Sequence, residues 1–402
     1  MRDEVSPVDR PDVRGIRLLF ITGLTGIGLG GARTEEIRLV SGAAERGCDV
    51  AMCSDVPAKE LADTRHFCLD YPPGDKAAGQ VARAVAEFKP ELVHVVGGGV
   101  RFLTTCSAQL NGVPWAFTAH NVPPAERIFP RLHGNSRLHY AVRNALAVPN
   151  VWAWSRYVKR AGFRLAICHS ETVRRRLTEI GCAADKIRVV PFGCGLPESA
   201  LAPDVAEGSP FPAGAYPRIV TLAGLAHHKG QLDAVRMAAR LLPDFPKLSY
   251  RLIGMSRDKT YRSFLEQTIR DLGLADHVSI LHAVPDSVKF TALREADLYV
   301  QPSHEEGFCI AFLEAAMLVP RLIGTDTGAI AAMGQGDDGI RVIKPGDVDS
   351  LTRAARELLG GDPANGAVAR RREALGRRYS WDAYLDAHLN AYRQMKSKSV
   401  EC

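Results

Sequence analysis

The chain has 402 residues, of which 46% are hydrophobic and 24% are charged, and its formal net charge is +6. This length predicts two domains, and the composition is ordinary for a globular protein with its own buried cores. No stretch reaches the roughly 18 consecutive apolar residues of a membrane span. Residues 1–14 are polar and charged and lack the apolar centre of a signal peptide. We therefore expect a disordered N-terminus over residues 1–14 and a cytoplasmic protein.

The nine cysteines are scattered along the chain and form no Cys-x-x-Cys pair. This pattern argues against a disulfide framework and against a zinc site. We expect most of them to fill the core, and we expect the protein to bind no metal.

Positive charge is concentrated in the first half of the chain. Residues 101–190 carry 14 Lys and Arg against 4 Asp and Glu, a surplus of ten positive charges. Its densest part, residues 152–160, mixes tryptophan and tyrosine with cations, as helices that lie on a membrane surface do. A solvated helix face with its aromatic side chains in the core explains the same residues. No nucleic-acid-binding motif accompanies the charge, so we expect no nucleic acid partner.

The first half of the chain alternates apolar runs with helical patterns. A strand is predicted over residues 15–22, followed by a glycine-rich loop (23–31), a helix (34–46) and a second strand (48–54). Such a unit is typical of a doubly wound parallel sheet. Further strands are predicted at residues 92–96, 115–119, 165–170 and 187–191. Together they predict one complete α/β domain over residues 15–197.

Five prolines between residues 196 and 217 indicate an exposed linker, which we place at residues 198–217. A second α/β domain is predicted over residues 218–378. Its strands are expected at residues 219–223, 250–253, 278–281, 298–301, 321–324 and 341–343. A final helix over residues 379–397 repeats apolar side chains at intervals of three and four, and must pack along one stripe.

The glycine-rich loop offers one functional hypothesis. Gly26, Gly28 and Gly31 match Gly-x-Gly-x-x-Gly after a strand, and Asp55 closes the next strand, as in a dinucleotide site. However, three residues separate the strand from the first of these glycines. A purely structural turn is a further possibility.

Residues 302–325 offer a second hypothesis. Glu314 is the only charged residue between positions 308 and 319, so its carboxylate needs partners among apolar neighbours. Two adjacent sugar hydroxyls would supply them. Glu306 precedes the predicted helix beside Gly307, where free amides and the helix dipole favour a phosphate. One segment then holds both halves of a nucleotide sugar. The alternative is that Glu314 pairs with a buried arginine and that Glu306 is a solvated loop residue.

The sequences Ala-Asp-Leu-Tyr-Val-Gln-Pro-Ser (296–303), Glu-Gly-Phe (306–308) and Leu-Glu-Ala (313–315) resemble the donor-site signature of family 4 retaining glycosyltransferases. The resemblance implies the GT-B architecture: two Rossmann-like domains facing a central cleft, with a C-terminal helix that crosses back onto the N-terminal domain. It also implies a retaining, metal-independent transferase that takes a sugar from a nucleotide diphosphate sugar, uridine-linked in our interpretation.

The same resemblance implies roles for individual residues. His120 ends the strand at 115–119 and would lie near the transferred sugar, Lys229 would meet the diphosphate, and Glu306 would contact the sugar. Glu314 would anchor the ribose. The implied donor-binding residues are Gly30, Gly31, Gly224, Lys229, Gly254, Leu281, His282, Glu306, Gly307, Phe308, Cys309, Ile310 and Glu314, and no cofactor is expected beyond the nucleotide sugar.

The chain departs from the family pattern at the donor site. The arginine that usually precedes the lysine is absent near Gly224, and Cys309 and Ala329 stand where glycines are usual. A one-residue shortening also removes the glycine before Pro320. These changes leave three rival hypotheses: a catalytically silent scaffold of the same fold, a dinucleotide oxidoreductase, and a nucleotide-sugar epimerase. For an active enzyme we expect a sugar, glycolipid or small-molecule acceptor, with possible peripheral contact at the inner face of the membrane.

Overall fold

The computed structural model describes residues 11–23, 31–55, 59–70, 75–122, 149–201, 208–256, 259–362 and 366–400. These residues form two compact units. The described residues of the first unit lie within Met1–Arg127, Ala141–Gly193 and Trp381–Cys402, and those of the second lie within Cys194–Ser380. The chain therefore passes from one unit to the other after Gly193, before the segment expected to be the linker.

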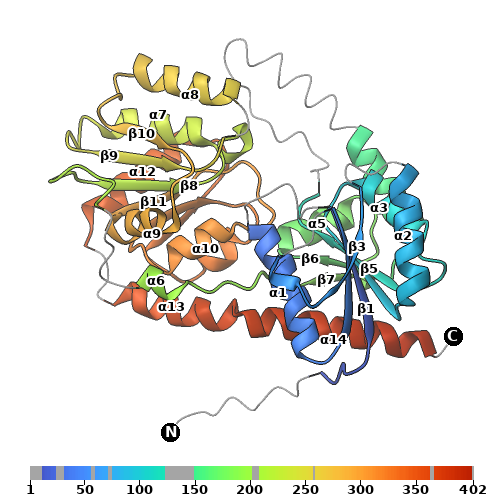
Figure 1. Cartoon of the computed structure of the whole chain (residues 1–402). Coiled ribbons are helices and arrows are strands. Elements are labelled where there is room, and N and C mark those ends of the chain that lie inside the picture. Colours follow the sequence, from blue (N-terminus) through green and yellow to red (C-terminus); the bar gives the residue numbers. More distant parts are fainter. Residues whose placement is uncertain are drawn as a thin grey trace, which may run out of the picture. The chain divides into compact units, whose positions relative to one another are not determined.

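The first unit contains a parallel sheet in the strand order β3-β2-β1-β4-β5-β6-β7 (Figure 1). The strands are β1 (Arg17–Thr22), β2 (Asp49–Ser54), β3 (Arg65–Cys68), β4 (Leu92–Val96), β5 (Trp115–Ala119), β6 (Leu165–Cys168) and β7 (Ile187–Val189). The helices are α1 (Gly31–Glu45), α2 (Asp75–Phe88), α3 (Val100–Ser107), α5 (Glu171–Glu179) and α14 (Trp381–Val400), and residues 149–160 are also helical. Two short 3-10 helices, Lys59–Leu61 and Ala184–Lys186, complete the unit.

Continuous apolar runs produce the central strands of this sheet. Every residue of β4 and β5 is buried, because helices cover both faces of a parallel sheet. The predicted strands all form, with ends shifted by at most two residues. Strand β3 was not predicted. In its sequence, Arg-His-Phe-Cys, only Phe67 is buried, so this edge strand lacks the apolar run that marks the others.

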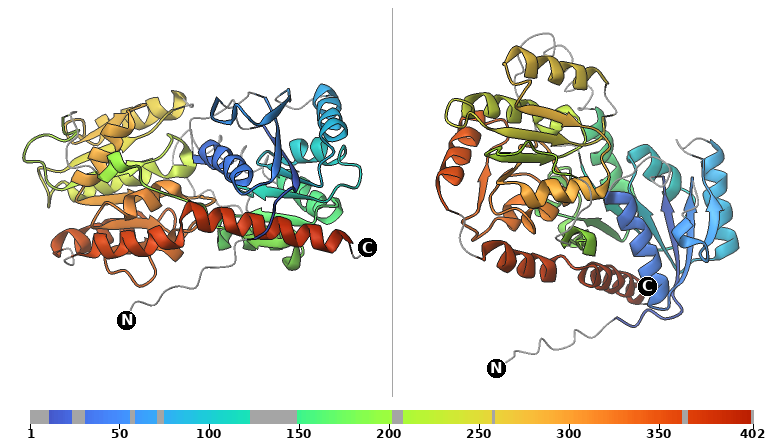
Figure 2. Two further views of the ribbon diagram at one scale, coloured as in Figure 1. Left: turned by 60° about the horizontal axis from the view of Figure 1, so that its bottom comes forward. Right: turned by 60° about the vertical axis from the view of Figure 1, so that its left-hand side comes forward.

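Helix α14 packs against α1 and β4 of the first unit, and both views of Figure 2 show it beside α1. Its apolar stripe includes Tyr384, Leu389 and Tyr392, which join the core. The Tyr392 hydroxyl lies 2.7 Å from Nδ1 of the buried His94. His94 Nε2 in turn lies 2.8 Å from Thr118 Oγ1, so this histidine is a satisfied core residue, as the sequence indicated.

Two sequence expectations need correction at the edges of the units. Residues 1–10 lie outside the described part, but residues 11–14 are ordered, and Val13 is buried in the core of the first unit. The segment expected to be an exposed linker contains helix α6 (Glu198–Leu201) and packs in part. Phe211 is buried, and Arg251 Nε donates a hydrogen bond of 2.6 Å to the Pro210 carbonyl. Proline content alone did not reveal this packing.

The second unit contains a parallel sheet in the order β10-β9-β8-β11-β12-β13. The strands are β8 (Arg218–Leu222), β9 (Ser249–Ile253), β10 (Val278–Leu281), β11 (Leu298–Gln301), β12 (Leu322–Thr325) and β13 (Ile340–Ile343), each within one residue of its predicted bounds. Besides α6, the helices are α7 (Gln231–Leu241), α8 (Lys259–Asp271), α9 (Asp286–Glu295), α10 (Ile310–Ala316), α11 (Ile330–Met333), α12 (Val348–Gly360) and α13 (Ala367–Arg378), with a 3-10 helix at His227–Lys229. Helices α7 and α12 pack together over one side of this core.

Candidate functional site

The predicted donor residues of the second unit gather at the carboxyl ends of its strands. Lys229 follows β8, Gly254 follows β9, His282 follows β10, and Glu306 follows β11. Strands β8 and β11 are neighbours although three elements of the chain separate them, so the strand order reverses between them. Ligands of open parallel sheets bind at such a switch point.

Close backbone contacts hold the loops after β8 and β11 together. Gly230 has φ +70, and a Cβ there would lie 2.0 Å from the Pro302 carbonyl oxygen, so only glycine fits. The amides of His304 and Glu305 donate to the His228 carbonyl at 2.8 and 3.4 Å. His304 Nε2 also lies 2.6 Å from Asp233 of α7. Lys229 and Glu306 are thereby brought to the same place.

Lys229 and Glu306 form a direct ion pair. The distance from Nζ to Oε2 is 2.8 Å, and the carboxylate side chain is only 7% exposed. Ser303 Oγ and Gln301 Nε2 donate to the other carboxylate oxygen at 2.7 and 3.3 Å. Burial acts to lower the pKa of Lys229, but the Glu306 charge outweighs it and the pKa lies above its usual value. Lys229 is therefore a cation at neutral pH, held by an oriented carboxylate.

Cys309 occupies a backbone conformation that favours glycine. Its φ is +83, in the left-handed region, and it immediately precedes α10. The glycine that the family pattern has here is thus explained by backbone geometry. Burial, followed by the Glu306 charge, raises the pKa of the Cys309 thiol well above its usual value. The thiol is neutral, and its neighbour Phe308 packs edge-on to Tyr379 at 5.6 Å between ring centroids.

Glu314 lies on α10 and pairs with Lys289 of α9, at 3.3 Å from Oε1 to Nζ. The partner is a lysine, not the arginine that the alternative hypothesis proposed. Lys289 also lies 3.2 Å from Asp286, so its charge is shared. Burial raises the pKa of Glu314 in spite of Lys289. Because 20% of its side chain is exposed, this carboxylate is accessible to a ligand.

The remaining predicted donor residues are placed as follows. A Cβ on Gly254 would lie 1.9 Å from the Ala223 carbonyl, and the Gly254 amide donates to the Leu281 carbonyl at 3.0 Å. Gly224 accepts a hydrogen bond of 3.0 Å from Gln231 Nε2, and His282 is exposed. Gly307 and Ile310 are half-buried. Gly30 lies outside the described residues, and Gly31 begins α1.

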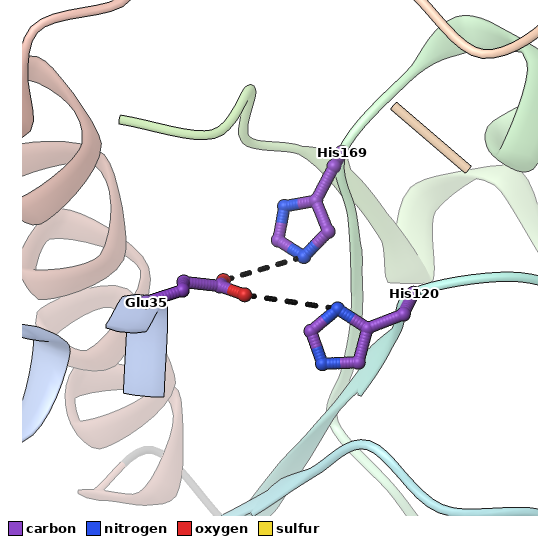
Figure 3. Close-up of side chains that lie close together, drawn as sticks. All are labelled: Glu35, His120 and His169. Atoms are coloured by element: carbon purple, nitrogen blue, oxygen red, sulfur yellow. Dashed lines mark ion pairs between the residues drawn. The ribbon is translucent and has the colours of Figure 1, made fainter. Parts of the chain in front are cut away.

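A second group of polar side chains lies in the first unit, where His120 follows β5. Figure 3 shows His120, Glu35 of α1 and His169, which follows β6, pointing toward one another. Glu35 Oε2 lies 3.7 Å from His120 Nδ1, and Glu35 Oε1 lies 3.4 Å from His169 Nε2. Burial lowers the pKa of His120 to about 4, and burial raises the pKa of Glu35. The sequence predicted His120 alone, although His169 also follows an apolar strand.

The basic segment of the first unit divides between core and surface. Trp154 and Tyr157 are buried, whereas Trp152 is 64% exposed. The Arg156 guanidinium lies over the Trp152 ring, 5.7 Å from its centroid. Both hypotheses for this segment hold in part, since two of the three aromatic residues serve the core and one faces solvent.

Comparison with known families identifies both halves of the chain. Residues 209–375 match the family model described as Glycosyl transferases group 1, and residues 29–195 match Glycosyltransferase Family 4. Among the described residues, no helix has both the length and the apolar character needed to cross a membrane.

Curated relatives match parts of the chain. A GDP-mannose-dependent alpha-(1-6)-phosphatidylinositol monomannoside mannosyltransferase of Mycolicibacterium smegmatis is 31% identical over 39% of this chain and 41% of its own length. A glycogen synthase of Mycobacterium tuberculosis is 25% identical over 77% of this chain and 70% of its own length. The chain spans about two fifths of the length of several curated relatives that it matches.

Solved structures match the fold over nearly the whole chain. Sucrose-phosphate synthase from Thermosynechococcus elongatus has a TM-score of 0.74 at 17% identity, covering 95% of this chain and 100% of its own. Anabaena HepE in complex with UDP and glucose has a TM-score of 0.67 at 17% identity, covering 94% of this chain and 100% of its own. The two parallel-sheet units are thus those of the GT-B fold.

Proposed function

Since the chain belongs to the family 4 glycosyltransferases, we propose that it transfers a sugar from a nucleoside diphosphate sugar to an acceptor hydroxyl with retention of configuration. The observation that carries this proposal is the Lys229–Glu306 pair at the switch point between β8 and β11. The resemblance described above gives these positions to the diphosphate and to the transferred sugar.

Charge explains what Lys229 would do. When the sugar leaves the nucleotide, negative charge grows on the diphosphate, and a fixed cation nearby stabilises it. Lys229 is charged and is held by the buried Glu306. A lysine acts as a compact point charge, so the leaving diphosphate needs no metal ion in this proposal. Glu306, fixed by Ser303 and Gln301, would accept hydrogen bonds from the sugar.

Glu314 would bind the ribose. Its carboxylate is mostly buried, and burial raises its pKa, so a ligand that donates hydrogen bonds to the carboxylate offsets part of the cost of desolvation. Adjacent ribose hydroxyls are such donors. The nucleobase would meet the loops after β9 and β10, where Gly254 and Leu281 present mainly backbone groups.

We propose uridine as the base, and HepE, whose structure contains UDP and glucose, supports this choice. A second candidate is GDP-mannose, which is favoured by the name of the mycobacterial relative. Isothermal titration with UDP, GDP and NAD⁺ separates the candidates. Binding of UDP that is tighter than that of GDP supports the first, the reverse order supports the second, and binding of NAD⁺ alone would support a dinucleotide oxidoreductase.

The acceptor would be a sugar, a glycolipid or a small molecule on the cytoplasmic side of the membrane. Exposed Arg156, Lys159 and Arg160 beside Trp152 support a peripheral contact of the helix at residues 149–160 with an anionic lipid surface. This contact favours an acceptor linked to lipid.

A further inference from the structure

We propose that Glu35, His120 and His169 bind one divalent transition metal ion, with Zn²⁺ as the ion that fits best. This site lies wholly in the first unit, whereas the residues assigned to the nucleotide sugar lie in the second. The proposal therefore goes beyond the proposed function and does not depend on it.

The spacing of the three side chains suits a small ion. Their candidate ligand atoms all lie within 4.8 Å of one another, and the two carboxylate–imidazole distances are 3.4 and 3.7 Å. Bonds from Zn²⁺ to nitrogen and oxygen are about 2.0–2.2 Å long, and in a tetrahedron they separate neighbouring ligand atoms by about 3.4 Å. The cluster is thus close to this arrangement without rotation of any side chain. Three protein ligands would leave a fourth position for water.

The hydrogen bonding of His169 aims a lone pair at Glu35. His169 Nδ1 lies 2.8 Å from the Val190 carbonyl oxygen, which can only accept, so Nδ1 carries the proton. In the neutral ring Nε2 then has only a lone pair, and this lone pair faces a carboxylate oxygen at 3.4 Å. Two acceptors repel each other unless a cation lies between them. A histidine whose other ring nitrogen donates to a backbone carbonyl is the usual arrangement of a metal ligand.

No hydrogen bond in the described structure satisfies the atoms that face this point. Glu35 Oε2, His120 Nδ1 and His169 Nε2 are all buried without a hydrogen-bond partner. Glu35 and His169 are 1% and 0% exposed. A buried carboxylate without a compensating cation is costly, and a metal ion would supply the missing charge for all three groups.

The surroundings hold the three ligands in place. The Tyr384 hydroxyl of α14 donates to Glu35 Oε1, which orients the carboxylate. Phe192 packs on the His169 ring at 3.8 Å between centroids, and the His120 and His169 rings stack at 5.3 Å. Two nitrogen ligands and one carboxylate favour Zn²⁺ or a neighbouring transition metal over Mg²⁺ or Ca²⁺, which prefer oxygen.

The test uses the full chain without a polyhistidine tag, stripped with a chelator and dialysed. Zn²⁺ is titrated by calorimetry, and Co²⁺ is titrated as a visible-absorption probe of coordination. We expect one ion per chain, d–d absorption bands from bound Co²⁺ that Zn²⁺ displaces, and a rise in melting temperature with Zn²⁺ concentration, because only the folded site binds.

Three variants locate the ion. His169→Gln and Glu35→Gln are each expected to weaken Zn²⁺ binding by on the order of 100-fold, since second-shell changes alone cost 10–100-fold. His66→Gln is the matched control, because His66 lies in the same unit and bonds to Ser54 instead. It should bind Zn²⁺ as the unchanged protein does.

The proposal is overturned if the unchanged protein binds neither Zn²⁺ nor Co²⁺, which would mean that the cluster shares protons only. It is also overturned if His169→Gln and Glu35→Gln fold, as judged by circular dichroism, and bind Zn²⁺ with unaltered affinity. In that case the ion lies elsewhere on the chain.

Discussion

At the scale of single residues, the donor site depends on charges that hold one another in place. Lys229 neutralises a carboxylate that is 7% exposed, and Ser303 and Gln301 complete the hydrogen bonds of that carboxylate. Removing either charge leaves the other without its partner. A diphosphate that approaches Lys229 would therefore compete with Glu306, and the lysine can interact most strongly with whichever anion carries more charge.

This competition predicts the effect of Lys229→Ala. Turnover should fall by about 10²–10³-fold, the loss typical of removing one group that stabilises developing charge. The affinity for the donor should fall much less, because the lysine acts mainly on charge that grows as the bond breaks. Steady-state kinetics separate the two effects. Lys247→Ala is the control, as Lys247 is exposed in the same unit. Full activity of Lys229→Ala would refute the assignment.

Glu314→Gln tests the ribose contact. An amide cannot accept through both ends as a carboxylate can, so the affinity for UDP should fall by about tenfold, or about 1.4 kcal/mol. Isothermal titration measures this, with Glu357→Gln on the exposed face of α12 as the matched control. Unchanged affinity in a folded Glu314→Gln protein would mean that Glu314 only pairs with Lys289.

Sequence reasoning reached the donor side chains because they lie in one short segment and follow apolar strands. It marked Cys309 as unusual, and the φ of +83 gives the physical reason. It could not predict that Lys229 pairs with Glu306, because 77 residues separate them. Glu35 and His169 escaped for the same reason. Their meeting depends on which strands become neighbours, and no local pattern records this.

At the scale of elements, helix α14 is fastened to the first sheet by a buried polar chain from Tyr392 through His94 to Thr118. Tyr392→Phe should lower the free energy of unfolding by about 1–3 kcal/mol, because it leaves His94 Nδ1 buried without a partner. Tyr216→Phe is the control. The Tyr216 hydroxyl bonds to the Leu359 carbonyl, but the residue is 43% exposed.

The four tryptophans make this measurement specific. They are Trp115, Trp152, Trp154 and Trp381, and all belong to the first unit. Denaturant unfolding followed by tryptophan fluorescence therefore reports on that unit alone. A midpoint of Tyr392→Phe equal to that of the unchanged protein would show that the buried chain does not stabilise the unit.

The helix at residues 149–160 carries the lipid prediction. The protein should sediment with anionic vesicles at low salt, and binding should weaken as salt rises, because surface charge acts over a Debye length of about 8 Å at physiological ionic strength. Replacing Arg156, Lys159 and Arg160 with Gln should abolish sedimentation and leave UDP affinity unchanged.

A matched triple variant controls for total charge. Arg353, Arg370 and Arg377 are exposed in the second unit, and their replacement with Gln removes the same number of charges. It should leave vesicle binding intact. If the unchanged protein stays in solution at low salt, the contact with anionic lipid is wrong and a water-soluble acceptor becomes the better proposal.

Element prediction succeeded where burial is continuous and failed where it is not. The central strands β4 and β5 are buried at every residue and were predicted to the residue. The edge strand β3 buries one side chain and was missed. Prolines indicated a linker, but Phe211 within it packs into the second unit.

At the scale of the whole molecule, both units are doubly wound parallel sheets with polar side chains at the carboxyl ends of their strands. Alternation of strands and helices predicted this class, because each period is visible in the sequence. The return of α14 to the first unit came from family resemblance, since its apolar stripe shows only that the helix packs. The division after Gly193 depends on contacts between distant segments, which no composition profile measures.

The central claim is that the second unit of this protein activates a nucleoside diphosphate sugar for transfer. The most direct measurement is nucleotide release from a panel of UDP- and GDP-sugars, with and without candidate acceptors, in buffer without added Mg²⁺ or Mn²⁺. Our account predicts release that requires an acceptor, that forms a product with the anomeric configuration of the donor sugar, and that is lost in Glu306→Gln. Sugar conversion without an acceptor, or nucleotide binding with no release from any donor, would contradict it.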